Sequence, residues 1–440
     1  MEYKNSTRQI NTPNLSSRGS TAGSSLGLFS CRLYGFLGAI VEQYEVSLFH
    51  LLGTAIAFHC FPPNNGLAQN LFYVYLLIPL SVVLKVLGGW FFGFVGDKYG
   101  TEFSLTLTIA GMAFCSFCLG IMPTYAQIGL FCTFFFFCLK MGQVFCRGGE
   151  YIGAALYTLS HSPTEKKGTF SGLYSGTYVL GTMLASGVSS LVCHNAGDAF
   201  SWQAPFLLGA LFSAIIFVFR RGSYASLSTR DKPSNLPSPG TTLSPCAPPY
   251  LQFIQFVLVT SGISALCCLS IFMGNAAIVS QQITLSEWLW IKQLELPAYF
   301  VFLVFFGRAA DKWGARRIMQ IAFVGSLLLA PWLLTAFLHT DKWGTLGIHL
   351  CLAAIAAAGF GPYHGWYRDL FPASHRARLC AIGYAIGSTL GGALPAMAQY
   401  TMNKLSIGVS LPLIYAMMAL FAVIGLLSLR QPRQIQGVTE

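Results

Sequence analysis

Two glutamates three residues apart lie in an otherwise apolar stretch near the start of the chain. Glu42 and Glu45 are surrounded by Ala, Ile, Val and Leu residues, and their spacing places them near one face of a helix. Two close carboxylates in an apolar environment disfavour double ionisation, so one of them binds a proton readily. We therefore expect this pair to take part in proton coupling. The alternative is that one glutamate pairs with a basic residue of another helix.

A polar stripe is predicted in a second apolar segment. Lys140, Gln143, Arg147 and Glu150 recur at spacings of three, four and three, which places them on one side of a helix. Ionisable side chains inside a membrane are costly and turn towards the bundle interior or water. Either Arg147 pairs with Glu150, or Arg147 or Lys140 binds a substrate carboxylate while Glu150 acts as counter-ion or proton site. Lys85, near the middle of its own apolar segment, is a further candidate cation.

A glycine-rich turn occurs twice in the chain. The copies share four positions at a constant offset of 214 residues: Gly93, Asp97, Lys98 and Gly100 in the first, and Gly307, Asp311, Lys312 and Gly314 in the second. This offset of nearly half the chain predicts two similar halves, each with the turn at the same place. The last glycine allows the positive φ of a short reversal, and the aspartate can face the positive end of a neighbouring helix. We expect conformational-control turns, with a plain solvated loop as the alternative.

The composition indicates an integral membrane protein. Hydrophobic residues make up 54% of the 440 positions and charged residues only 9%, against about 25% charged residues in soluble domains. The net charge of +11 does not indicate nucleic-acid binding, because the basic residues lie in the gaps between apolar segments. Most of the thirteen cysteines lie inside those segments, where cysteine packs as a small apolar residue. We expect no metal site and no cofactor.

Twelve apolar stretches are long enough to cross a bilayer, which takes about 20 residues. They must be helices, since lipid offers the backbone no hydrogen-bonding partner. The expected spans are 33–59, 70–95, 103–122, 126–155, 169–192, 204–220, 251–279, 286–306, 317–338, 345–366, 377–400 and 409–429. The predicted fold class is an all-α integral membrane protein with twelve transmembrane helices in two six-helix halves.

A segment rich in proline and serine separates the sixth span from the seventh and predicts a linker. The expected organisation is a disordered tail (1–32), an N-terminal bundle (33–220), the linker (221–250), a C-terminal bundle (251–430) and a second tail (431–440).

Basic residues are unevenly divided between the two sets of gaps. Most lie on the side shared with the N-terminus, the linker and both turns, whereas the opposite gaps contain only Lys292, Lys342 and Lys404. Because cytoplasmic loops of membrane proteins are enriched in Lys and Arg, we expect both termini and both turns in the cytoplasm.

Four stretches, at 38–45, 88–100, 140–168 and 369–395, carry a family resemblance. The first reads Gly-Ala-Ile-Val-Glu-Gln-Tyr-Glu, and the third contains Gly-Gly-Glu ending at Glu150. Together they resemble the major facilitator superfamily, and within it the metabolite:proton symporters. Gln43 and Glu45 stand where that family has Trp and Asp, and Arg147 stands where it has a small uncharged residue.

The resemblance implies a secondary active transporter that takes up a small zwitterionic or anionic metabolite with protons by alternating access. A substrate like proline or glycine betaine is favoured. A proton symporter of dicarboxylates or other organic acids, such as 2-oxoglutarate, citrate or shikimate, is the first alternative. A non-transporting sensor is the second. We expect no enzymatic activity, a monomer in the plasma (inner) membrane, and the substrate, protons and the lipid bilayer as partners.

Overall fold

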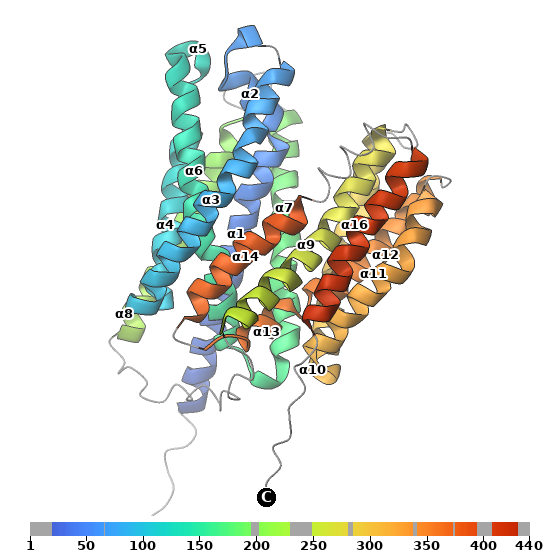
Figure 1. Cartoon of the computed structure of the whole chain (residues 1–440). Coiled ribbons are helices and arrows are strands. Elements are labelled where there is room, and N and C mark those ends of the chain that lie inside the picture. Colours follow the sequence, from blue (N-terminus) through green and yellow to red (C-terminus); the bar gives the residue numbers. More distant parts are fainter. Residues whose placement is uncertain are drawn as a thin grey trace, which may run out of the picture.

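The structure, a computed structural model, describes residues 20–65, 67–194, 202–228, 249–279, 285–337, 341–372, 375–393 and 407–429. Over these ranges the ordered elements are helices, and none is a strand. The long helices stand side by side, as Figure 1 shows.

Six long helices form the N-terminal half: α1 (Ser20–Leu51), α3 (Leu67–Tyr99), α4 (Thr101–Gly120), α6 (Leu130–Ser160), α7 (Lys167–His194) and α8 (Ala204–Ser228). The short elements between them are α2 (Gly53–His59), η1 (Pro63–Asn65), α5 (Tyr125–Ile128) and η2 (Thr164–Lys166).

The C-terminal half has α9 (Pro249–Val279), α10 (Leu285–Trp313), α11 (Ala315–Phe337), α12 (Lys342–Phe360), α14 (Arg376–Gly392) and α16 (Ile407–Ser428), with the short α13 (Tyr363–Arg368) after α12. Each of the twelve expected spans therefore contains a helix in the described part of the chain, and the predicted fold class is confirmed.

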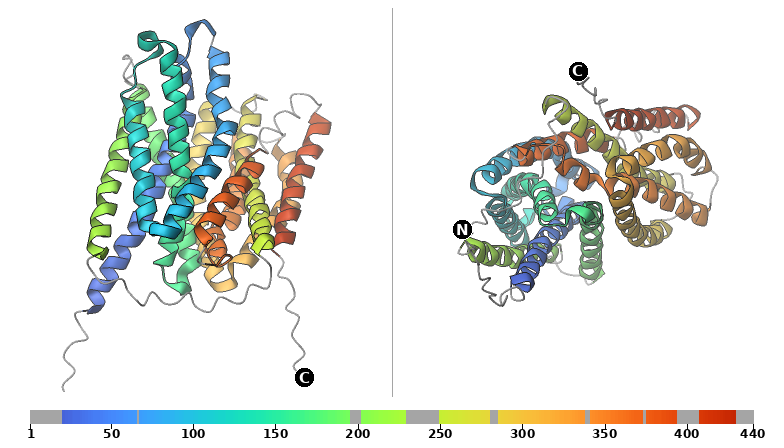
Figure 2. Two further views of the ribbon diagram at one scale, coloured as in Figure 1. Left: turned by 60° about the vertical axis from the view of Figure 1, so that its left-hand side comes forward. Right: turned by 90° about the horizontal axis from the view of Figure 1, so that it is seen from below.

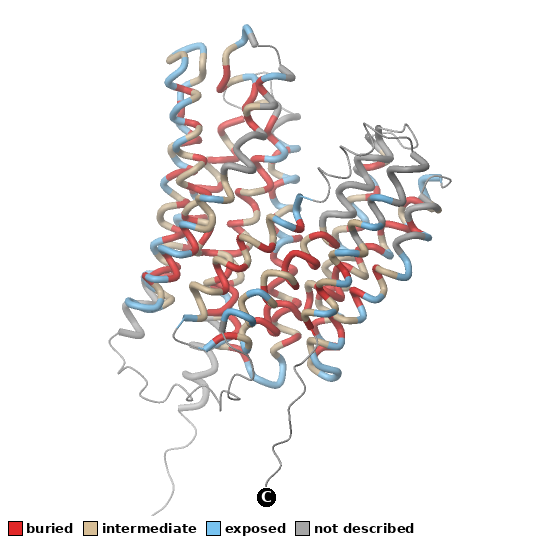
Figure 3. Tube along the Cα trace, viewed as in Figure 1, coloured by how far each residue is buried: buried red, intermediate tan, exposed pale blue. Residues whose placement is uncertain are grey.

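The outer surface of the bundle is apolar. Among the described residues, six helices are long and apolar enough to cross a membrane. Large apolar side chains such as Phe131 and Leu328 are about 70% exposed, while buried residues follow the helix faces that point towards each other (Figure 3). A surface of this kind is stable against lipid rather than water, so the chain is a multi-pass membrane protein.

Three expected boundaries differ in the structure. Helix α1 begins at Ser20, so residues 20–32 are helical and not disordered as expected. The reason is that no proline interrupts 20–51, and a helix already nucleated gains one hydrogen bond for each residue added. Helix α8 continues to Ser228 and α9 begins at Pro249, so both ends of the expected linker are helical. Residues 229–248, 1–19 and 430–440 lie outside the described residues.

The two repeated turns have the same geometry. Gly100 connects α3 to α4 with a φ of 98°, and Gly314 connects α10 to α11 with a φ of 89°. Both turns lie at the lower end of the bundle in Figure 1, where α1 begins and α16 ends. We call this the turn end and the opposite end the far end. The left-handed backbone explains why glycine stands at both positions.

The halves meet along two helix pairs, α3 with α14 and α7 with α10. A Cβ atom on Gly93 of α3 would lie 2.9 Å from the Cα atom of Arg378 of α14. A Cβ atom on Gly307 of α10 would collide with the carbonyl oxygen of Gly168 of α7. Glycine thus permits the two close crossings that join the halves. The two halves lie side by side in the view from below (Figure 2).

Candidate functional site

The first expected carboxylate, Glu42, pairs with the expected cation Arg147. Arg147 Nε of α6 donates to Glu42 Oε1 of α1 across 3.0 Å, and the two side chains are 29% and 5% exposed, respectively. The second carboxylate oxygen of Glu42, Oε2, is buried without a hydrogen-bond partner. Arg147 makes no other ion pair or hydrogen bond among the described residues. The pair therefore has a free acceptor on the acid and free donors on the base.

Glu150 has a different partner, so the alternative in which Arg147 pairs with Glu150 is wrong. Arg220 of α8 holds Glu150 in a bidentate pair, with Nη2 to Oε1 at 2.6 Å and Nη1 to Oε2 at 3.0 Å. Thr108 Oγ1 donates a third hydrogen bond to Oε2. Glu150 is fully buried and Arg220 is 5% exposed. A buried and fully satisfied pair of this kind binds α4, α6 and α8 together.

Arg220 is the last residue of the sixth expected span, 204–220, and the sequence did not predict it as a site residue. The sequence signal that could have identified it is its position directly after an apolar run, on the sixth span of the same half. Arg220 also donates to the backbone oxygens of Leu105 and Tyr34. Together with the two bonds to Glu150, this uses all four N–H groups of Nη1 and Nη2, so the forked face of the guanidinium is not available to a substrate.

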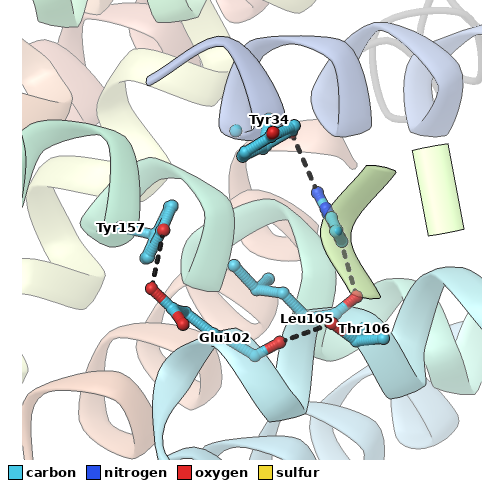
Figure 4. Close-up of a pocket in the computed structure, with 7 residues that line it drawn as sticks. Tyr34, Glu102, Leu105, Thr106 and Tyr157 are labelled. Atoms are coloured by element: carbon cyan, nitrogen blue, oxygen red, sulfur yellow. Dashed lines mark hydrogen bonds between the residues drawn. The ribbon is translucent and has the colours of Figure 1, made fainter. Parts of the chain in front are cut away.

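A small cavity lies beside Arg220 at the turn end. It has about 20 Å³ and is lined by Tyr34, Gly35, Glu102, Leu105, Thr106, Tyr157 and Arg220. Figure 4 shows the hydrogen bond from Tyr157 to Glu102 beside Tyr34 and Leu105, whose backbone oxygens accept from Arg220. This volume has room for about one water molecule. The cavity is therefore too small to be a substrate site.

Glu45 belongs to a second buried network. Ser116 Oγ donates to Glu45 Oε1 across 2.6 Å, and Gln143 Nε2 donates to Glu45 Oε2 across 2.7 Å. Lys140 Nζ donates to Gln143 Oε1 across 2.6 Å and lies 4.8 Å from the centre of the Phe49 ring. Gln143 thus connects the carboxylate to the ammonium group. Of the expected stripe, Gln143 bonds to Glu45 and Lys140 reaches it through Gln143, whereas Arg147 bonds to Glu42 and Glu150 bonds to Arg220.

Lys85 lies between the two halves of the molecule. Its Nζ atom is 3.3 Å from Ser388 Oγ and 4.5 Å from the centre of the Tyr384 ring, both on α14. Tyr384 stacks on Tyr151 of α6 with ring centres 4.8 Å apart. Neither Tyr384 nor Ser388 was among the expected site residues, because nothing in the sequence pairs helix α14 with Lys85.

The charges of the site do not balance. Its carboxylates are Glu42, Glu45 and Glu150, and its cations are Lys85, Lys140, Arg147 and Arg220. Three of the cations have a carboxylate, directly or through Gln143. Lys85 has none within bonding distance among the described residues, although Glu42 and Arg147 both act on it electrostatically. Lys85 is thus the cation of the site that has no bonded carboxylate in the described part of the chain.

The turn aspartates bind across the halves. Asp97 Oδ2 accepts from Arg378 Nε of α14 across 2.5 Å. Asp311 accepts from the backbone N–H groups of Gly168 and Thr169 across 2.6 and 2.9 Å, at the first turn of α7. Both aspartates thus face the N-terminal turn of a helix in the other half, where the helix dipole is positive.

Other contacts between the halves lie at or near the same end. His364 of α13 meets Tyr151 and Ser175 of the N-terminal half, each at 3.1 Å. Lys167 pairs with Asp369 across 3.0 Å. In the described part of the chain, the halves are therefore joined from the turn end up to the level of Lys85.

Comparisons with known proteins agree with this architecture. Residues 48–297 match the family model described as Major Facilitator Superfamily. The chain is 27% identical over 416 residues to a glycine betaine/proline/ectoine/pipecolic acid transporter of Dickeya dadantii, covering 89% of this chain and 80% of the relative. It is 26% identical over 418 residues to a proline/betaine transporter of Escherichia coli, covering 89% and 81%.

Solved structures show the same fold. The proton:xylose symporter bound to 6-bromo-6-deoxy-D-glucose superposes with a TM-score of 0.71 at 15% identity, covering 92% of this chain and 95% of that one. A bacterial homologue of the iron transporter ferroportin in an outward-facing state gives a TM-score of 0.65 at 12% identity, covering 90% and 99%.

Proposed function

The chain belongs to the major facilitator superfamily, and on this premise we propose that it is a secondary active transporter that couples uptake of a small zwitterionic metabolite to protons. A substrate like proline or glycine betaine is the preferred class. The observation that carries the proposal is the Glu42–Arg147 pair together with Lys85, which has no bonded carboxylate among the described residues.

The proton site is Glu42. Its Oε2 atom is buried and unbonded, so a proton placed there displaces no existing hydrogen bond. Protonation cancels the charge that holds Arg147, and the guanidinium is then free to bind a carboxylate. The Arg147 side chain is 29% exposed, so a substrate can reach it. Proton binding and substrate binding thereby favour each other through one arginine.

The substrate carboxylate meets the released Arg147 together with Lys85, and the ammonium group of a zwitterion meets the tyrosines. Lys85 is the cation without a carboxylate partner, and it lies between the halves, where both can contact a bound molecule. The stacked rings of Tyr151 and Tyr384 lie beside it, and aromatic faces attract quaternary ammonium groups. The names of the relatives, which mention betaine and proline, support this class.

An organic-acid symporter is the second candidate. It is favoured by the presence of two cations, Lys85 and Arg147, that act on each other electrostatically. When Glu42 is protonated, both become available to anions. A dicarboxylate would give each cation its own carboxylate, whereas a zwitterion offers one carboxylate to both.

Alternating access is proposed to open and close the turn end. The contacts of Asp97 and Asp311 hold the halves together there, and the state with these contacts is the one open towards the far end. Basic residues such as Arg308, Arg316 and Arg376 belong to elements at the turn end. By the positive-inside rule, the turn end is cytoplasmic, in the plasma (inner) membrane.

Lys85→Ala tests the substrate site. In proteoliposomes we expect its apparent KM for betaine or proline to rise at least about thirtyfold, the effect of losing a charge-assisted contact of about 2 kcal/mol. Lys342→Ala removes an exposed lysine at the start of α12 and serves as the matched control. An unchanged KM in Lys85→Ala would remove Lys85 from the site. Uptake of dicarboxylates in preference to betaine would select the second candidate.

A further inference from the structure

Two cysteines face each other at the far end of the N-terminal half. Cys60 follows the last residue of α2, and Cys132 lies in the first turn of α6. Both side chains are fully buried and present as free thiols in one apolar cluster. Each thiol influences the charge of the other, which agrees with their place in one cluster. The transport site uses neither of them.

Further contacts hold the two backbones side by side. Thr133 Oγ1 donates to the carbonyl oxygen of Cys60 across 2.7 Å, and Cys132 Sγ lies 4.0 Å from the carbonyl oxygen of His59. Two consecutive residues of one element thus touch two consecutive residues of the other. These contacts place the two cysteines on adjoining backbone segments, which a disulfide requires.

The chemistry of the surroundings favours a disulfide over a metal site. Among the described residues, no group of three or more His, Cys, Asp or Glu side chains could hold a metal ion. Helix α2 and the start of α6 lie at the far end in Figure 1, opposite the turns. In the orientation proposed above, on which this inference rests, that end faces the extracytoplasmic compartment, where disulfides form and persist.

We propose that Cys60 and Cys132 are joined by a disulfide in the native protein. One S–S bond forms as the two thiols lose two protons and two electrons. The electron acceptor is a disulfide-bearing thiol oxidase or small-molecule disulfide of that compartment, which is reduced to two thiols. The bond forms while the chain folds, before α2 covers the start of α6.

The disulfide ties together the helices that carry the proposed coupling pair. Helix α2 continues α1, which bears Glu42, and α6 bears Arg147. A covalent link between the far ends of these helices limits how far they separate when the bundle rocks. The disulfide thus limits the spacing of the helices that carry Glu42 and Arg147. It does not change the contacts that these two side chains make.

The experiment counts thiols in the full-length protein. Membranes are treated with N-ethylmaleimide at once to block free thiols, and the protein is purified and denatured. It is then treated with or without reductant and labelled with polyethylene glycol–maleimide. We expect wild-type protein to take up two labels only after reduction, seen as a gel shift. Cys60→Ala and Cys132→Ala should each lose this shift, and Cys115→Ala, which removes a buried cysteine of α4, should retain it.

Two outcomes would overturn the proposal. One is a wild-type protein without reductant-dependent labels, and the other is a shift that survives in Cys60→Ala. A reporter fused to the C-terminus that is active only in the cytoplasm tests the orientation separately. A cytoplasmic C-terminus without a reducible bond would reject the disulfide alone, and an external C-terminus would reject the orientation on which it rests.

Discussion

Removing Arg220 should destabilise the folded protein far more than removing Arg147. Arg220 makes two hydrogen bonds to Glu150, which is fully buried, so Arg220→Ala leaves a carboxylate with only Thr108 as donor. Breaking a buried pair in this way costs about 3–5 kcal/mol. This corresponds to a roughly 100- to 5,000-fold lower ratio of folded to unfolded protein.

The predicted loss of stability should be reversible by a second substitution. Glu150→Gln combined with Arg220→Met removes both charges, and replacing a buried pair by neutral groups is often close to neutral in stability. Arg221→Ala, which removes the exposed neighbouring arginine of α8, is the matched control. We expect wild-type stability for the control and most of it for the double variant.

Arg147→Ala should behave in the opposite way. The Arg147 side chain is 29% exposed, so in the variant water can replace part of the hydrogen bonding that Arg147 gives Glu42. Glu42 can also take up a proton and become neutral. We expect a stability near that of wild type together with loss of uptake. Thermal unfolding of detergent-solubilised protein, followed by size-exclusion chromatography, compares the variants. A stable Arg220→Ala protein, or an Arg147→Ala protein that unfolds as readily as Arg220→Ala, would refute the assignment of structural and functional roles.

Three further predictions concern coupling and the halves. Asp97→Asn removes the charge that binds Arg378, and we expect slower uptake although the protein reaches the membrane at its normal level. A normal uptake rate would show that the turn is only a solvated loop. Glu42→Gln should abolish accumulation driven by a pH gradient while substrate exchange persists, and unchanged accumulation would move the proton site elsewhere. Gly307→Leu should keep α7 and α10 apart and abolish uptake. Gly347→Leu, at a position facing open space, should leave uptake intact. Equal uptake by the two variants would show that the close α7–α10 contact is not needed for transport.

The sequence predicted what depends on local pattern. The apolar spans follow from composition over about 20 residues, and the positive φ at Gly100 and Gly314 follows from residue type in a short reversal. The extent of α1 and α8 did not follow, because a helix can continue past the membrane wherever the backbone meets no proline.

The partners of the charged residues could not be predicted. Lys140 to Glu150 covers about 15 Å of helix, so members of one stripe meet different neighbours. Arg147 meets Glu42 from 105 positions earlier, and Glu150 meets Arg220 from 70 positions later. Such pairs depend on how each helix is rotated in the bundle, and no local pattern in the sequence specifies that rotation.

The most direct test of the account is uptake by the purified protein in proteoliposomes. Radiolabelled glycine betaine and proline are supplied with and without an imposed inward proton gradient, at equal sodium on both sides. The account predicts accumulation above the external concentration only with the proton gradient, and its collapse on addition of a protonophore. Accumulation that ignores the proton gradient and follows an imposed sodium gradient instead would contradict it.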